Sequence, residues 1–146
     1  MASTYLALNF HVVFSTLKRV NFIEEEWRAD LHAYLGGTAR GLGCIPRAIN
    51  GTADHVHLLL GTKATHSIAD VVREVKKASS TWAKERQPRF AWQEGYSAFT
   101  VGKSEIETIK QYIANQEEHH CSYSSADEMR RILAEEEIEF DEKYFE

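Results

Sequence analysis

Segments rich in β-branched and aromatic residues alternate with segments of helical periodicity along this chain. The strand-like segments are residues 5–15, 44–50, 54–60 and 95–102. Apolar residues recur at helical spacing in residues 23–43 and in a segment that begins at Ser67. The order β-α-β-β-α-β predicts an α+β, ferredoxin-like (RRM-like) fold, in which a four-stranded antiparallel sheet carries two helices on one face. The opposite face must then be covered by another element or used for binding.

Two further helices are expected near the C-terminus. The S-x-x-E sequences Ser104–Glu107 and Ser125–Glu128 have the pattern of capping boxes, in which the Ser and Glu side chains satisfy free backbone N–H groups. The first predicts a helix over residues 104–120, which is available to cover the free face of the sheet, and the second predicts a short C-terminal helix.

The charge of the chain is unevenly distributed. Residues 117–146 hold 11 acidic and 3 basic side chains, whereas residues 1–116 hold 11 acidic and 14 basic ones. An acidic end therefore masks a mildly basic body, and binding to phosphate groups stays open. We expect a single catalytic domain over residues 1–120 and an acidic C-terminal helix and tail over residues 121–146.

The sequence favours a cytoplasmic protein without a membrane segment. No run approaches the roughly 20 apolar residues that span a bilayer. The first residues lack the basic start, apolar stretch and cleavage site of a signal peptide. Cys44 and Cys121 have no metal-binding spacing and suggest no disulfide framework.

The segment DHVHLLL places two histidines in a predicted strand. Because side chains alternate along a strand, His55 and His57 share one face while Val56 and its apolar neighbours share the other. Their Cβ atoms are then about 6.5–7 Å apart, close enough for two imidazoles to bind one divalent metal if a third ligand is present. Asp54 could orient a ligand from behind. The simpler interpretation is two packed histidines without a metal.

Tyr112 and Gln116 lie one turn apart on the predicted third helix. They could be a boundary tyrosine and a solvated glutamine. Alternatively, the Gln116 oxygen completes a metal site with the two histidines, and Tyr112 is a nucleophile beside it. A phenol with a pKa of about 10 attacks poorly at neutral pH, so it needs an activator such as a divalent cation.

Five segments together resemble a known family. These are HVVFSTLKR, DHVHLLL, FAWQEGYSAFTVG, IKQYIANQEEHH and the ending IEFDEKYF. In this order they resemble the single-tyrosine HUH transposases of small bacterial insertion sequences, the insertion-sequence-200-like family, and the related REP-associated tyrosine transposases. The resemblance places the metal ligands at His55, His57 and Gln116 and the catalytic nucleophile at Tyr112.

The resemblance implies a DNA transposase that acts on single-stranded hairpin DNA. The strand would be cut and rejoined by transesterification through a 5′-phosphotyrosine, with Mg2+ as cofactor and Mn2+ as an alternative. It also implies a homodimer in which the tyrosine helices can be exchanged between subunits, although REP-associated relatives can work as monomers. The protein would be associated with bacterial DNA.

Five basic residues are candidates for contacts to the DNA backbone: Lys18, Arg19, Arg73, Lys76 and Lys77. Each could equally be a solubilising surface charge.

Two other functions fit parts of the pattern. An RRM-like binding module would use aromatic side chains on an open sheet face to stack bases, without catalysis. A water-using metal phosphodiesterase would share the histidine pair but give Tyr112 no task.

Overall fold

The computed structural model describes residues 3–116 and 124–139. The elements in chain order are β1 (Leu8–Ser15), the 3₁₀ turn η1 (Leu17–Arg19), α1 (Glu25–Gly41), β2 (Ile45–Gly51), β3 (His55–Thr62), α2 (Ile68–Lys84), β4 (Ser97–Thr100), η2 (Lys103–Glu105), α3 (Ile106–Ala114) and α5 (Ser125–Glu135). Helix α3 ends at Ala114 with Asn115 as its C-cap, so the prediction of one helix over residues 104–120 is wrong at this point, and residues 117–120 lie outside the described residues.

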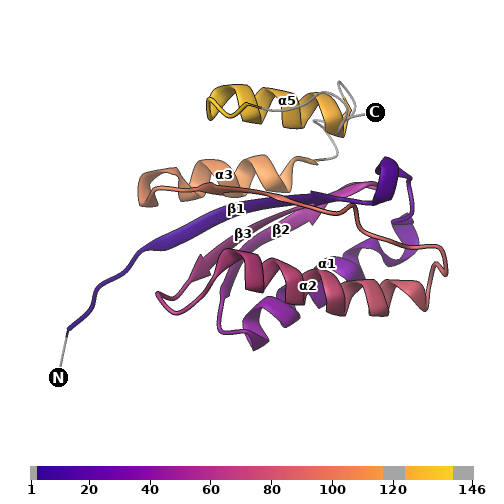
Figure 1. The fold of residues 1–146 in the computed structure, drawn as a ribbon, viewed down its shortest axis with the longest axis horizontal. Coiled ribbons are helices and arrows are strands. Elements are labelled where there is room, and N and C mark those ends of the chain that lie inside the picture. The colour runs from indigo at the N-terminus through magenta and orange to yellow at the C-terminus, as the bar shows by residue number, and fades with distance from the viewer. Residues whose placement is uncertain (1–2, 117–123, 140–146) are drawn as a thin grey trace.

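The four strands form one antiparallel sheet in the order β2-β3-β1-β4, and α1 and α2 cover one of its faces (Figure 1). This confirms the predicted α+β, ferredoxin-like fold. Strand β4 is shorter than the predicted segment 95–102. Gly95 has a φ of +90°, which is not extended backbone, and its carbonyl accepts a hydrogen bond from the Lys76 ammonium group rather than from a strand.

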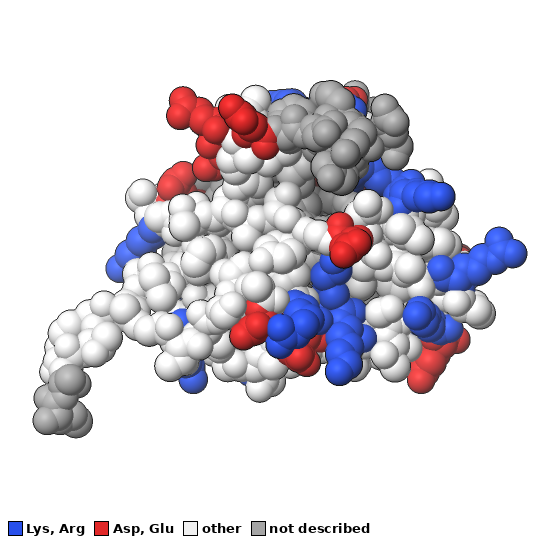
Figure 2. All heavy atoms as spheres, viewed as in Figure 1, with Lys and Arg blue, Asp and Glu red and all other residues white. Residues whose placement is uncertain are grey.

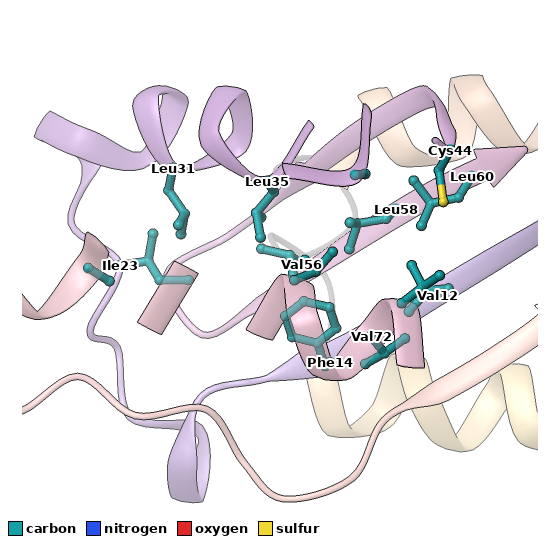
Figure 3. Close-up of a cluster of buried hydrophobic side chains, with 14 of the residues drawn as sticks. Val12, Phe14, Ile23, Leu31, Leu35, Cys44, Val56, Leu58, Leu60 and Val72 are labelled. Atoms are coloured by element: carbon teal, nitrogen blue, oxygen red, sulfur yellow. The ribbon is translucent and has the colours of Figure 1, made fainter. Parts of the chain in front are cut away.

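The main core lies between the sheet and the α1–α2 layer. Val56, Leu58 and Leu60 of β3 lie in this core together with Leu31 and Leu35 of α1 (Figure 3). The prediction that Val56, Leu58 and Leu60 form the core-facing side of β3 is therefore correct. Each such buried side chain contributes roughly 1.5–3 kcal/mol through the hydrophobic effect, which fixes the register of β3 and points its alternate residues to the other face.

Helices α3 and α5 lie over the other face of the sheet (Figure 1). Ile113 of α3 and Leu59 of β3 are buried in one small apolar cluster. Leu133 of α5 packs against Val13 of β1 and Phe99 of β4 in another. The predicted covering of the free face by the third helix is confirmed, and α5 extends it. Among the described residues, none of the helices has the length and apolar character needed to cross a bilayer.

Both predicted capping boxes are displaced. Helix α3 begins after η2, where the Gly102 N–H donates to the Glu105 carboxylate, so the Ser104 prediction is wrong. At α5 the N-cap is Ser124, which accepts a hydrogen bond from the backbone N–H of Asp127. The sequence S-S-A-D-E fits a cap at either serine. Capping by Ser124 leaves the Glu128 side chain free to be buried elsewhere.

A candidate metal and nucleophile site

The two histidines of β3 lie side by side beneath α3 and α5. His55 and His57 are 1% and 0% exposed, and their ring centroids are 5.0 Å apart. Both Nε2 atoms approach one oxygen of Glu128: the Oε1 atom is 3.2 Å from His55 and 2.9 Å from His57. The imidazoles share the face that strand alternation predicts, and they converge on a single point.

Gln116 follows the last turn of α3 and is buried, not solvated. Its Oε1 atom is 3.0 Å from Nε2 of His55, and its Nε2 atom donates to Oε2 of Glu128 at 3.2 Å. The structure therefore brings together the two histidines and the glutamine that the sequence analysis singled out.

Glu128 of α5 belongs to this cluster and was missed by sequence reasoning. The carboxylate is 2% exposed, and its ligand atom and those of His55 and His57 lie within 4.8 Å of one another. These three residues form a buried group that could hold a metal ion. A signal was present, because Glu128 lies on the same side of α5 as the apolar residues Met129, Ile132 and Leu133, where a buried charge requires partners.

The outer nitrogen of His55 is held in place by Asp54. The Asp54 carboxylate lies 2.8 Å from Nδ1 of His55, and Thr52 is also within hydrogen-bonding distance of that nitrogen. Burial lowers the pKa of His55, but the hydrogen bonds and charges of Asp54 and Glu128 outweigh it and raise the pKa to about 9. Burial raises the pKa of Asp54, and hydrogen bonds from His55, Ser125 and Thr52 outweigh this and lower it. Asp54 therefore lies where the sequence predicted, behind a candidate ligand.

A third histidine, which the sequence analysis did not assign to the site, supports His57. His11 of β1 is hydrogen-bonded through Nε2 to Nδ1 of His57 at 2.8 Å, and the rings are stacked. Burial, together with His57, lowers the pKa of His11 to about 3, so this ring is neutral and can accept the proton on Nδ1 of His57. With Nδ1 of His57 directed at His11, Nε2 of His57 faces the Glu128 carboxylate at 2.9 Å.

The Tyr112 hydroxyl reaches the same cluster from α3. It donates a hydrogen bond to the Glu128 carboxylate, and its ring centroid is 5.8 Å from that of His57. A pocket lined by Tyr112, Glu128 and His11, with Phe99 and Arg131 among the other lining residues, adjoins this point. The phenol and both imidazoles therefore meet within one chain, beside a space that a substrate can enter.

The candidate DNA-contacting residues are in different environments. Lys18 is exposed, whereas Arg19 is half-buried and donates to the hydroxyls of Ser15 and Ser125. Ser125 in turn donates to Asp54, so Arg19 is linked to the histidine site by two hydrogen bonds.

The other three residues belong to α2, on the opposite side of the sheet from the histidines. Arg73 is exposed and paired with Asp70, and Lys77 is exposed. Lys76 donates to the backbone carbonyls of Gln93 and Gly95, so it holds the loop before β4. In Figure 2, blue basic side chains gather over α2 and red acidic ones over the end of α5.

Comparisons with known proteins identify relatives of this chain and of its fold. Residues 4–116 match the family model described as "Transposase IS200 like". Among solved structures, a predicted transposase from Deinococcus radiodurans R1 is 28% identical, with a TM-score of 0.64, over 80% of this chain and 96% of that one. A REP-associated tyrosine transposase bound to a REP hairpin has the same fold, with a TM-score of 0.58 at 13% identity, over 79% of this chain and 70% of that one. No curated protein matches the sequence.

Proposed function

This chain belongs to the IS200-like transposase family, and from that premise we propose that it cuts and rejoins single-stranded DNA through a covalent bond to Tyr112. The observation that supports this most directly is the convergence of the Tyr112 hydroxyl with His55 and His57 on one buried carboxylate. Metal-assisted phosphoryl transfer to a side chain uses a nucleophile that lies beside the metal ligands, as Tyr112 does here.

The reaction would exchange one phosphoester for another. The Tyr112 oxygen attacks phosphorus as its proton leaves, the bond from phosphorus to the 3′ oxygen breaks, and that oxygen takes up a proton. The products are a 5′-phosphotyrosine and a free 3′-hydroxyl. Because the number of phosphodiester bonds is unchanged, a 3′-hydroxyl can attack the phosphotyrosine and rejoin a strand.

The residues present fit a divalent metal. Two imidazole nitrogens and the side-chain oxygens of Gln116 and Glu128 converge, and both imidazoles are held through their other nitrogen. We assign His55, His57 and Gln116 as ligands of Mg2+ or Mn2+. When bound, the ion would supply positive charge to the phosphate and favour the ionised phenol. Asp54 and His11 orient the ligands.

Hairpin DNA is the proposed substrate because one structural neighbour is bound to a REP hairpin. The exposed Lys18 lies on η1, directly before Arg19, which is linked to the site, and is the best placed of the five candidates to meet the phosphate backbone there. Arg73 and Lys77 lie across the sheet from Tyr112, so we propose them only for DNA that extends around the sheet edge.

The two competing functions fit less well. An RRM-like module needs an open sheet face, whereas α3 and α5 cover this one. A phosphodiesterase that uses water would leave the hydrogen bond from Tyr112 to Glu128 without a task. The homodimer with exchanged tyrosine helices stays a prediction. In the described residues, Tyr112 lies beside the histidines of its own chain.

The experiment uses hairpin-forming single-stranded DNA labelled at either end, incubated with the full chain and Mg2+ or Mn2+, and analysed on a denaturing gel. We expect the 3′ label to move with the protein in a slow band and the 5′ label to appear on a shortened free strand. Tyr112→Phe should abolish both products.

The controls separate the alternatives. Cleavage that persists in Tyr112→Phe without a slow band would support the water mechanism, and tight binding without cleavage would support the RRM-like module. His57→Ala should abolish cleavage while retaining much of the hairpin affinity, since phosphate contacts dominate binding. Equal loss of both would mean that His57 is chiefly structural.

A further inference from the structure

Glu128 combines a buried negative charge with a position at the centre of the site. An isolated buried carboxylate is costly, and it persists in proteins when hydrogen-bonded, paired with a cation or bound to a metal. The groups around it include two imidazoles, a carboxamide and a phenol, supplied by β3 and the α3 region. Its position is therefore determined by the functional side chains.

The two oxygens of Glu128 face different partners. Oε1 lies 2.9 and 3.2 Å from the Nε2 atoms of His57 and His55, which are the nitrogens that point inward. Oε2 accepts hydrogen bonds from Tyr112 and Gln116. One oxygen is thus directed at the candidate ligands and the other at the candidate nucleophile.

We propose, as an inference that rests on the proposed function, that Glu128 is a fourth protein ligand of the metal through Oε1 and holds the Tyr112 hydroxyl beside the metal through Oε2. Both imidazoles are fixed by hydrogen bonds at Nδ1, so their Nε2 atoms, which bind a metal once unprotonated, are directed to the place where Oε1 already lies. A carboxylate adds a charged, hard oxygen, the type of donor that Mg2+ and Mn2+ prefer. Helix α5 then belongs to the catalytic centre.

A different role predicts the opposite result. If Glu128 only fills the place of the DNA phosphate, its removal would leave metal binding unchanged or strengthen it. If Glu128 is a ligand, its removal weakens metal binding in the absence of any DNA. The affinity of the protein for the metal alone therefore separates the two roles.

The test is calorimetric titration of Mn2+ into the metal-free full chain, without DNA. We expect Glu128→Gln, which keeps the side-chain volume but loses the charge, to bind Mn2+ roughly tenfold more weakly or worse. Glu135→Gln makes the same change at an exposed position two turns along α5 and should bind as the wild type does. Wild-type or tighter Mn2+ binding by Glu128→Gln would overturn the proposal.

Folding and the metal site itself are checked separately. Circular dichroism in EDTA checks that Glu128→Gln has the wild-type structure. If it does not, Glu128→Asp is used in its place. We then expect Glu128→Asp to bind Mn2+ several-fold more weakly than the wild type, and unchanged binding would contradict the proposal.

His57→Ala separates failure of the Glu128 proposal from failure of the proposed metal site. Loss of Mn2+ binding in His57→Ala but not in the Glu128 variant rejects only the fourth ligand. Undiminished binding in His57→Ala rejects the metal site of the proposed function.

Discussion

Tyr112 on α3 donates a hydrogen bond to Glu128 on α5, 16 residues further along the chain. The contact joins the two helices that cover one face of the sheet, and it does so at the carboxylate that both histidines approach. The position of the phenol is therefore coupled to the docking of α5 as well as to α3, the helix on which it lies.

Removing this hydroxyl should cost stability even without metal or DNA. A hydrogen bond to a charged group contributes more than a neutral one, and Glu128 keeps its other partners when the phenol is lost. We expect Tyr112→Phe to lower the free energy of unfolding by about 1–2 kcal/mol in urea titrations with EDTA. Tyr96→Phe, at a 41% exposed tyrosine, is the control and should change little. Equal stability of the two variants would argue against the hydrogen bond.

His11 should matter for the metal although it is not a proposed ligand. Its Nε2 atom is hydrogen-bonded to Nδ1 of His57 and the two rings stack, so His11 keeps Nε2 of His57 directed at the proposed metal site. We expect His11→Ala to weaken Mn2+ binding by roughly 10–100-fold, measured by the same titration. His66→Ala, at a loop histidine bonded to the Leu42 carbonyl, should leave the affinity unchanged. Identical effects of the two substitutions would contradict a specific role for His11.

Features set by local periodicity could be predicted from the sequence. Strand alternation alone places His55 and His57 on one face, and a spacing of four residues places Gln116, just beyond the end of α3, next to Tyr112. Both follow from a few neighbouring residues and need no knowledge of the tertiary structure.

Features set by docking could not be predicted in this way. His11 reaches His57 because β1 pairs with β3 in a register that sets Val13 opposite His57. Glu128 reaches both histidines only because α5 folds back over the sheet, and its sequence fits a capping role equally well. The sequence suggests that Lys76 is a surface charge on an amphipathic helix. In the structure its ammonium group donates to the Gln93 carbonyl, a contact that depends on the path of the loop before β4.

His32 should make stability fall as the pH is lowered. Burial, with a smaller contribution from Arg28 one turn before it on α1, lowers the pKa of His32 from 6.5 to about 4. Between pH 6.5 and pH 4 the unfolded chain binds a proton at His32 that the folded chain does not. The free energy of unfolding is therefore unaffected by the titration of His32 above pH 6.5 and falls as the pH is lowered towards 4. We expect His32→Leu to reduce the loss of unfolding free energy between pH 7.5 and 5 by about 1–2 kcal/mol, measured in urea with EDTA. Parallel curves for the two proteins would show that His32 is not the source.

Lys18 and Arg19 are adjacent in sequence but should differ in role. Lys18 is exposed, so Lys18→Ala should weaken binding to hairpin DNA and reduce the slope of log affinity against log salt by about one. Arg19 donates to Ser15 and to Ser125, which holds Asp54, so Arg19→Ala should lower the free energy of unfolding by about 1–2 kcal/mol. Fluorescence anisotropy of labelled hairpin DNA at several KCl concentrations, with urea unfolding of the same variants, measures both quantities. The assignment fails if Arg19→Ala alters only the salt slope, because Arg19 would then bind phosphate and not connect η1 to α5.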